Sequence, residues 1–272
     1  MDARALIVCA AMAVAAGLVG CFAVMRRMTL AADAFSHVAL PGIGLALVLR
    51  LNPLIGALVA LLAGSMLIWA IEGKTKLSTE AITGVVFSVA LAIGSLTATG
   101  EELIDALFGT PGSMTIAETI FALVAALAVI AFILKARDRL LVSLVSTEVA
   151  IASGIGVTSL QLSFLVAFAV TVALGMRYLG VLLMGSLIII PATVAKRLAR
   201  SIDGMFAIAI GAALASTLLG TWIAAFAHRP SGPVIVGIAG GLFFLSLVKL
   251  PAPRPKAYAD KETPTVATKN SI

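Results

Sequence analysis

The chain has 272 residues, of which 61% are hydrophobic and 12% are charged, and its mean hydropathy is +1.14. A soluble domain carries roughly 25% charged residues, so this composition excludes an ordinary soluble protein and indicates an integral membrane protein. The formal net charge of +6 does not indicate a nucleic-acid partner, because the basic residues stand at the ends of apolar runs.

Apolar segments follow one another along almost the whole chain. They lie at residues 5–24, 34–50, 53–71, 79–98, 117–134, 161–178, 180–195, 204–226 and 232–249. A helix needs about 20 apolar residues to cross a bilayer, and the second and seventh segments are short. The sequence therefore predicts an all-α, polytopic bundle of eight to nine transmembrane helices. The apolarity is continuous within each segment, which excludes the alternating pattern of a transmembrane β-barrel.

The first segment has no basic leader beyond Arg4 and no clear cleavage site, so we interpret it as a retained span and not as a signal peptide. It also holds both cysteines, Cys9 and Cys21, whose spacing indicates apolar packing residues and neither a disulfide framework nor a zinc site. We expect a transmembrane domain over residues 1–249. Residues 250–272, rich in Pro, Thr and charge, predict a disordered cytoplasmic tail.

Basic residues predict the orientation of the spans. They cluster at Arg26-Arg27, Lys74/Lys76, residues 135–139, residues 196–200 and Lys249 with the tail. These positions fall at alternate loops of a nine-span bundle, so the positive-inside rule makes those loops cytoplasmic and places the N-terminus outside. Glycines within the spans predict close approach of helices: Gly17, Gly20, Gly180, Gly185, Gly237, Gly240 and Gly241.

An acid and an imidazole stand together at the start of the second segment, in "ADAFSHVALPG" at residues 32–42. Asp33 and His37 are at i and i+4 and share one face of a helix. Carboxylate and imidazole together suit Zn, Mn or Fe(II). Three interpretations stay open on spacing alone: metal contact, hydrogen bonding between helices, and proton relay. Two ligands do not close a metal site, so a twofold-related copy, or backbone carbonyls and waters, would have to complete it.

Prolines in two apolar segments predict interruptions. Pro41-Gly42 is expected to break the helix just past the two candidate ligands, and Pro191 is either a second break or an ordinary kink in the seventh span. The stretch "EGKT" at residues 72–75 lacks the first glycine of a phosphate-binding loop, since position 68 is Ile. The chain therefore carries no ATPase machinery of its own.

The longest cytoplasmic connection, residues 135–160, contains a less apolar stretch at residues 145–159 that predicts a short surface helix. Ser146 or Thr147 is expected to cap this helix, and Gly154 and Gly156 to end it. On the opposite side, an acidic loop is formed by Glu101, Glu102 and Asp105. It is interpreted as a surface that steers cations, docks a protein, or is simply solvated. His228, in an outer turn, is interpreted as structural.

Several of these stretches resemble the membrane permease subunits of zinc/manganese/iron-type bacterial ABC importers. They are "GCFAVMRRMTLAADAFSHVALPGIGLAL" (20–47), "LIDALFGT" (103–110), "VSTEVAIASGIGV" (145–157), "RYLGVLLMGSLIIIPATVAKRLAR" (177–200) and "PSGPVIV" (230–236). The first departs from the family pattern at Ala32, where the family usually has Gly.

The resemblance implies a type II ABC importer permease that works as a homodimer in the cytoplasmic membrane. It implies that a separate ATPase subunit docks on the short helix and that an extracytoplasmic protein delivers the metal. The residues it assigns to the ATPase contact are Thr147, Glu148, Ala152, Gly154 and Gly156. It assigns Asp33 and His37 to contact with the transported Zn, Mn or Fe, and no resident cofactor. The alternatives are a permease for a metal chelate and a proton-coupled secondary cation carrier.

Overall fold

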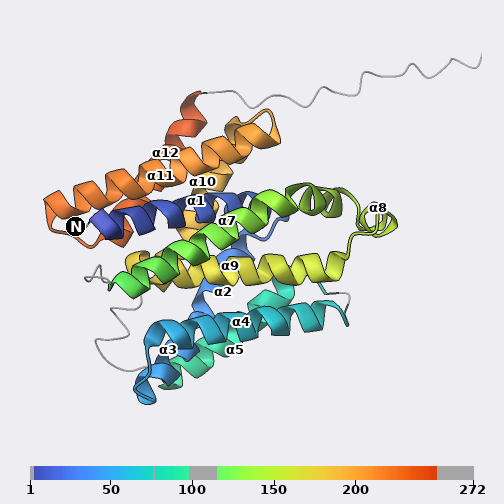
Figure 1. Cartoon of the computed structure of the whole chain (residues 1–272), viewed down its shortest axis with the longest axis horizontal. Coiled ribbons are helices and arrows are strands. Elements are labelled where there is room, and N and C mark those ends of the chain that lie inside the picture. Colours follow the sequence, from blue (N-terminus) through green and yellow to red (C-terminus); the bar gives the residue numbers. More distant parts are fainter. Residues whose placement is uncertain (1–2, 76, 98–114, 250–272) are drawn as a thin grey trace, which may run out of the picture.

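The structure is a computed structural model that describes residues 3–75, 77–97 and 115–249. Within these stretches all regular secondary structure is helical (Figure 1). The helices are α1 (Ala3–Met25), α2 (Thr29–His37), α3 (Ala39–Val48), α4 (Pro53–Glu72), α5 (Thr79–Thr97), α7 (Ile116–Val145), α8 (Thr147–Ala152), α9 (Val157–Leu179), α10 (Val181–Leu198), α11 (Ile202–Ala227) and α12 (Ser231–Lys249).

Six of the described helices are long and apolar enough to cross a membrane: α1, α4, α7, α9, α11 and α12. Two shorter apolar helices cover Ala39–Val48 and Thr79–Gly94. The predicted all-α membrane fold is confirmed, with one refinement in the second segment. There the chain forms two helices, α2 and α3, separated at Val38.

The fifth predicted span is longer than its apolar run. We expected it to end near residue 134, but α7 continues to Val145 and carries the basic cluster on its last turns. Partners outside α7 stabilise this extension, because Arg137 pairs with Asp203 and its guanidinium lies 5.6 Å from the centre of the Phe206 ring. The predicted cytoplasmic connection is therefore helical over its first residues.

The helices form two groups (Figure 1). One contains α1, α7, α9, α10, α11 and α12; the other contains α3, α4 and α5. The groups join where α4 packs on α9, and α2 lies between them in contact with α10 and α5. Helix α1 is the most enclosed of the six: 78% of the residues in its most apolar stretch are buried, because α7, α9, α10 and α11 surround it.

Close backbone approaches occur at only some of the glycines we predicted. A Cβ added to Gly20 would collide with the carbonyl oxygen of Ile188, and one added to Gly17 would lie 3.1 Å from the carbonyl oxygen of Ala209. These two positions let α10 and α11 pack directly on α1. Within the described part of the chain the prediction was wrong for Gly237, Gly240 and Gly241, because an added Cβ at any of them would meet no described atom within 4 Å.

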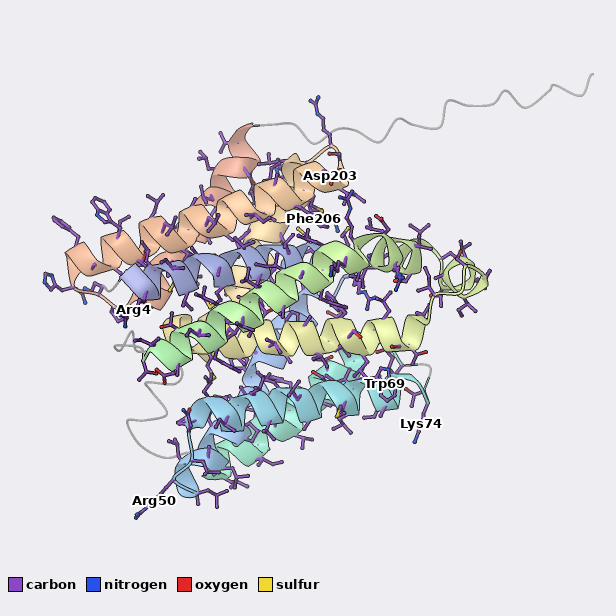
Figure 2. All side chains as sticks on the ribbon, in the orientation of Figure 1. Arg4, Arg50, Trp69, Lys74, Asp203 and Phe206 are labelled. Carbon is purple, nitrogen blue, oxygen red and sulfur yellow. The ribbon has the colours of Figure 1, made fainter. Side chains whose placement is uncertain are left out.

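Basic residues from different loops gather at one end of the bundle. Lys196 donates to the carbonyl oxygen of Val24, immediately before Arg26-Arg27, and Arg137 pairs with Asp203. Figure 2 shows Lys74 and Asp203 at this end and Arg4 and Arg50 at the other. We refer to the first as the cytoplasmic end, following the positive-inside rule.

Candidate functional site

The two ionisable residues of the second segment lie on α2, a helix of nine residues that starts just after the turn at Arg26-Arg27. Asp33 and His37 are one turn apart and share a helix face, as predicted. The helix stops immediately after His37, and α3 begins at Ala39. Pro41 is tolerated because it falls in the first turn of α3, where backbone N–H groups have no intrahelical partner.

Two neighbouring helices hold α2 in place. On one side, a Cβ added to Gly185 of α10 would lie 2.7 Å from Oδ1 of Asp33 and 3.4 Å from the hydroxyl oxygen of the buried Ser36. On the other side, the half-buried His37 ring packs against Phe87 of α5, with ring centres 5.5 Å apart. The absence of a side chain at Gly185 therefore brings α10 onto the acid, and an aromatic ring orients the imidazole.

As metal ligands, Asp33 and His37 offer one carboxylate and one imidazole from a single chain. In the described part of the chain, no group of three or more His, Cys, Asp or Glu residues is placed to hold a metal ion. Asp33 is nevertheless exposed. An ionisable side chain that faces lipid costs several kcal/mol, so such residues face a passage or a protein partner. The arrangement suits brief contact with a cation and is not a closed structural site.

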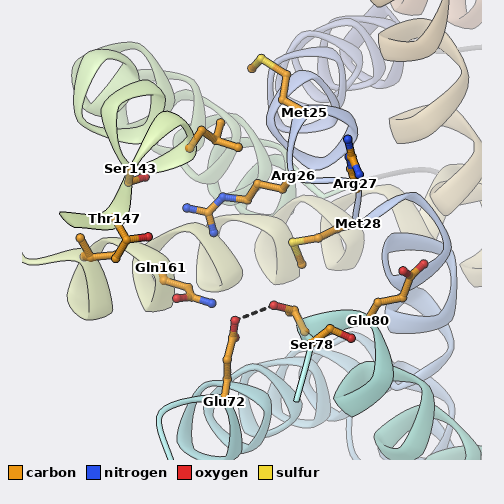
Figure 3. Close-up of a pocket in the computed structure, with 13 residues that line it drawn as sticks. Met25, Arg26, Arg27, Met28, Glu72, Ser78, Glu80, Ser143, Thr147 and Gln161 are labelled. Carbon is orange, nitrogen blue, oxygen red and sulfur yellow. Dashed lines mark hydrogen bonds between the residues drawn. The ribbon is translucent and has the colours of Figure 1, made fainter. Parts of the chain in front are cut away.

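A cavity of about 510 Å³ opens at the cytoplasmic end, directly before α2 (Figure 3). Its walls come from the α1–α2 turn, the ends of α4 and α7, and the starts of α5, α8 and α9. We refer to it as the Arg26 cavity. Four charged side chains line it: Arg26, Arg27, Glu72 and Glu80.

Two opposite charges share the Arg26 cavity. The Arg26 guanidinium lies 4.9 Å from the centre of the Phe164 ring, and burial lowers the pKa of Arg26 while the charge of Glu72 partly restores it. Thr79 donates a hydrogen bond of 2.6 Å to Oε1 of Glu72 (dashed in Figure 3), and Oε2 of Glu72 is buried with no hydrogen-bond partner among the described residues. The cavity thus holds a cation and an anion that stabilise each other through space.

The predicted surface helix is present as α8, but it is shorter than expected. Ser146 caps it by accepting a hydrogen bond from the Val149 amide. The helix ends before Gly154, which has φ of +74° and whose amide N–H donates a hydrogen bond to the carbonyl oxygen of Ile151, forming a left-handed C-terminal cap. Gly156 instead precedes α9. The five predicted contact residues are all exposed: Thr147, Glu148, Ala152, Gly154 and Gly156.

The other candidates divide into described and undescribed positions. Glu101, Glu102, Asp105 and the tail at residues 250–272 lie outside the described residues. Cys9 and Cys21 are buried and free in α1, as expected of packing residues. His228 ends α11 in the left-handed conformation, with φ of 52°. Pro191 does not interrupt α10, which continues through it.

Sequence reasoning missed the neighbours that complete the site. It singled out Gly185 as a packing glycine but not as the residue against Asp33, used Arg26 only to orient the spans, and gave no role to Phe87 or Glu72. Only the packing of α10, α5 and α4 around α2 brings these residues together. The one available signal was the ionisable Glu72 at the end of an apolar run.

Comparisons with known proteins agree with this architecture. The ABC 3 transport family matches residues 2–250. The "High-affinity zinc uptake system membrane protein ZnuB" of Haemophilus influenzae is 31% identical over 236 residues, covering 85% of this chain and 90% of the relative. The "Manganese import system permease protein ScaB" of Streptococcus gordonii is 28% identical over 255 residues, covering 92% of each chain.

Two solved structures are also similar. The PsaBC complex from Streptococcus pneumoniae with Fab has a chain that is 27% identical, with a TM-score of 0.78 and coverage of 92% of this chain and 91% of that one. An inward-facing putative metal-chelate type ABC transporter aligns with a TM-score of 0.67 at 18% identity, covering 89% of this chain and 85% of that one. The second likeness concerns the fold alone.

Proposed function

Since this chain belongs to the ABC 3 transport family and is the multi-pass inner-membrane permease subunit of a bacterial divalent-metal importer, we propose that Asp33 and His37 contact the ion as it crosses. ATP hydrolysis takes place on a separate subunit, and a binding protein supplies the substrate. The observation that carries the proposal is the exposed Asp33 on a helix fixed between α10 and α5. An acid held in this way is available to a passing cation.

The donor pair favours a bare transition-metal ion. Carboxylate oxygen and neutral imidazole nitrogen suit zinc, manganese and ferrous iron, and relatives are named for zinc, manganese and iron transport. A chelated metal already has its coordination sphere filled and would not need this pair. Few ligands also favour transport, because the ion must leave as well as enter.

The proposal extends to a homodimer. Asp33 is exposed in the single chain although its helix lies among membrane spans. A twofold-related copy that covered this face would remove the carboxylate from lipid and would bring two acids and two imidazoles to one point. Four such donors match the coordination number that zinc prefers. The binding protein is proposed to dock at the outer loops, including the loop with Glu101, Glu102 and Asp105.

We propose α8 as the ATPase contact. Thr147 at its start also lines the Arg26 cavity, together with the turn that leads directly into α2. Movement of α8 therefore alters the walls of the space adjoining the helix that carries the metal ligands. This shared cavity supports a route by which ATP binding in the partner alternates access to Asp33 and His37.

Reconstitution tests the metal contact. The chain, its ATPase and its binding protein are placed in vesicles, and ATP-dependent uptake of radiolabelled zinc and manganese is measured. Asp33→Asn and His37→Gln are expected to reduce uptake by at least about tenfold, since even outer partners of metal ligands contribute 10–100-fold. Asp138→Asn, at an exposed position at the cytoplasmic end and outside the site, serves as the charge-matched control. Normal uptake in both site variants would refute the assignment.

A further inference from the structure

A second cavity, of about 520 Å³, lies at the cytoplasmic end between the last turns of α7 and the α8–α9 turn. It shares no lining residue with the Arg26 cavity. Its walls include Phe132, Lys135 and Arg139 from α7, Gly154 and Gly156 from the turn, and Ser159 from α9. The proposed path of the metal does not pass through it, although Gly154 and Gly156 also belong to the predicted ATPase contact.

This second cavity is positively charged. Lys135 and Arg139 are one turn apart on the same face of α7, and both are exposed. Its lining contains no Asp or Glu. Among the described residues, neither cation has a carboxylate within 4.0 Å, whereas Arg137 between them points away to Asp203.

The N-terminus of helix α9 adds to the positive electrostatic potential of this cavity. It begins at the cavity, and no side chain caps its first turn after Gly156. Free backbone N–H groups at a helix N-terminus favour an anion. Together with the two cations of α7, they select a negatively charged ligand.

An apolar stripe runs along α7 from this cavity toward the middle of the bundle. Phe132 lines the cavity, and Ala128, Val124 and Phe121 continue the same helix face at three- and four-residue spacing. Phe121 and Val124 are 55% and 60% exposed. At 1.5 Å per residue, the distance from Phe121 to Arg139 is about 27 Å. One face of α7 is thus apolar along the membrane and basic at its cytoplasmic exit.

We infer that the second cavity binds the phosphate headgroup of an anionic phospholipid from the cytoplasmic leaflet, with an acyl chain along the cytoplasmic half of the apolar stripe of α7. Lys135 and Arg139 hold the phosphate, and Phe132 contacts the start of the hydrocarbon. Basic pockets between membrane helices on the cytoplasmic side are suited to such headgroups. A soluble anion would contact only the basic end, whereas a phospholipid also contacts the apolar residues beside it.

Lipid binding by the full chain tests this inference without reference to metal uptake. The protein is purified in a neutral detergent, washed free of lipid and mixed with dioleoylphosphatidylglycerol, dioleoylphosphatidylcholine or inorganic phosphate. Native mass spectrometry measures bound lipid, and thermal unfolding measures stabilisation. Phosphatidylglycerol is expected to bind at least about tenfold more tightly than phosphatidylcholine.

Charge variants locate the site. Lys135→Gln with Arg139→Gln should weaken phosphatidylglycerol binding on the order of 30-fold, and Lys135→Arg with Arg139→Lys should keep it. Lys74→Gln with Arg200→Gln removes the same charge from exposed positions at the same end but outside this cavity, and should leave binding unchanged.

Three results would overturn the inference. One is equal binding of the two lipids, or undiminished binding by the glutamine pair. Another is full stabilisation by inorganic phosphate alone, which would make this a site for a free anion. The third is a glutamine pair that still binds phosphatidylglycerol but no longer retains the ATPase subunit, which would make the cavity part of the ATPase interface.

Discussion

Gly185 of α10 lies against Asp33 of α2 so closely that an added Cβ would be 2.7 Å from the carboxylate oxygen and 3.0 Å from Cα. We predict that Gly185→Ala displaces the carboxylate or separates the two helices, and that metal uptake falls about tenfold or more. Uptake by reconstituted vesicles measures this. Gly211→Ala in α11, where an added Cβ meets nothing within 4 Å, is the control. Normal uptake by the Gly185 variant would mean that this contact does not position Asp33.

The turn after α8 offers a pair of glycines with opposite requirements. Gly154 has φ of +74°, whereas Gly156 has φ of −71° and room for a Cβ. Because a left-handed residue with a side chain costs about 1–2 kcal/mol, we predict that Gly154→Ala shifts α8 and raises the number of ATP molecules hydrolysed per ion transported. Gly156→Ala, which adds a Cβ in the same turn without straining the backbone, should change this ratio less. Equal ratios in the two variants would argue against α8 as the coupling element.

Helices α3 and α4 meet at two glycines. A Cβ on Gly42 would collide with the carbonyl oxygen of Gly56, and a Cβ on Gly56 with that of Gly42. Either alanine substitution is expected to lower the free energy of unfolding by about 1–3 kcal/mol, the usual cost of overpacking. Thermal unfolding in detergent measures it. Gly84→Ala, at an open position in α5, should instead be neutral or stabilising.

The charges in the Arg26 cavity are predicted to be energetically coupled. Glu72→Gln removes the charge that offsets burial, so it lowers the pKa of Arg26 further and destabilises its charged form. A double-mutant cycle of Arg26→Gln and Glu72→Gln, read from unfolding free energies, should show a coupling of about 1 kcal/mol. The same cycle with Glu80→Gln should be nearly additive. Additivity in both cycles would show that Arg26 and Glu72 act independently.

Most spans could be predicted because the length of an apolar run in the sequence sets the length of the membrane helix that it forms. The runs at residues 53–71, 204–226 and 232–249 match α4, α11 and α12 within about two residues. The end of α7 could not be predicted, because charged residues leaving a membrane are compatible with either helix or loop. Its continuation depends on Arg137 meeting Asp203, which is distant in sequence.

The candidate site was predictable in part for the same reason. Asp33 and His37 stand out because ionisable groups are costly in an apolar segment. Their neighbours Gly185 and Phe87 are ordinary residues of membrane helices, and nothing in the order of residues connects them to α2. Only the three-dimensional packing identifies them.

The burial of α1 constrains how the protein is made. This helix is synthesised before α7, α9, α10 and α11, which enclose it. Its faces at Gly17 and Gly20 are therefore exposed to lipid until α11 and α10, which pack against them, have been inserted. A segment this hydrophobic can insert into the bilayer on its own and associate with the other helices afterwards. Correct assembly of the subunit thus depends on α1 associating with helices that are synthesised after it, namely α7, α9, α10 and α11.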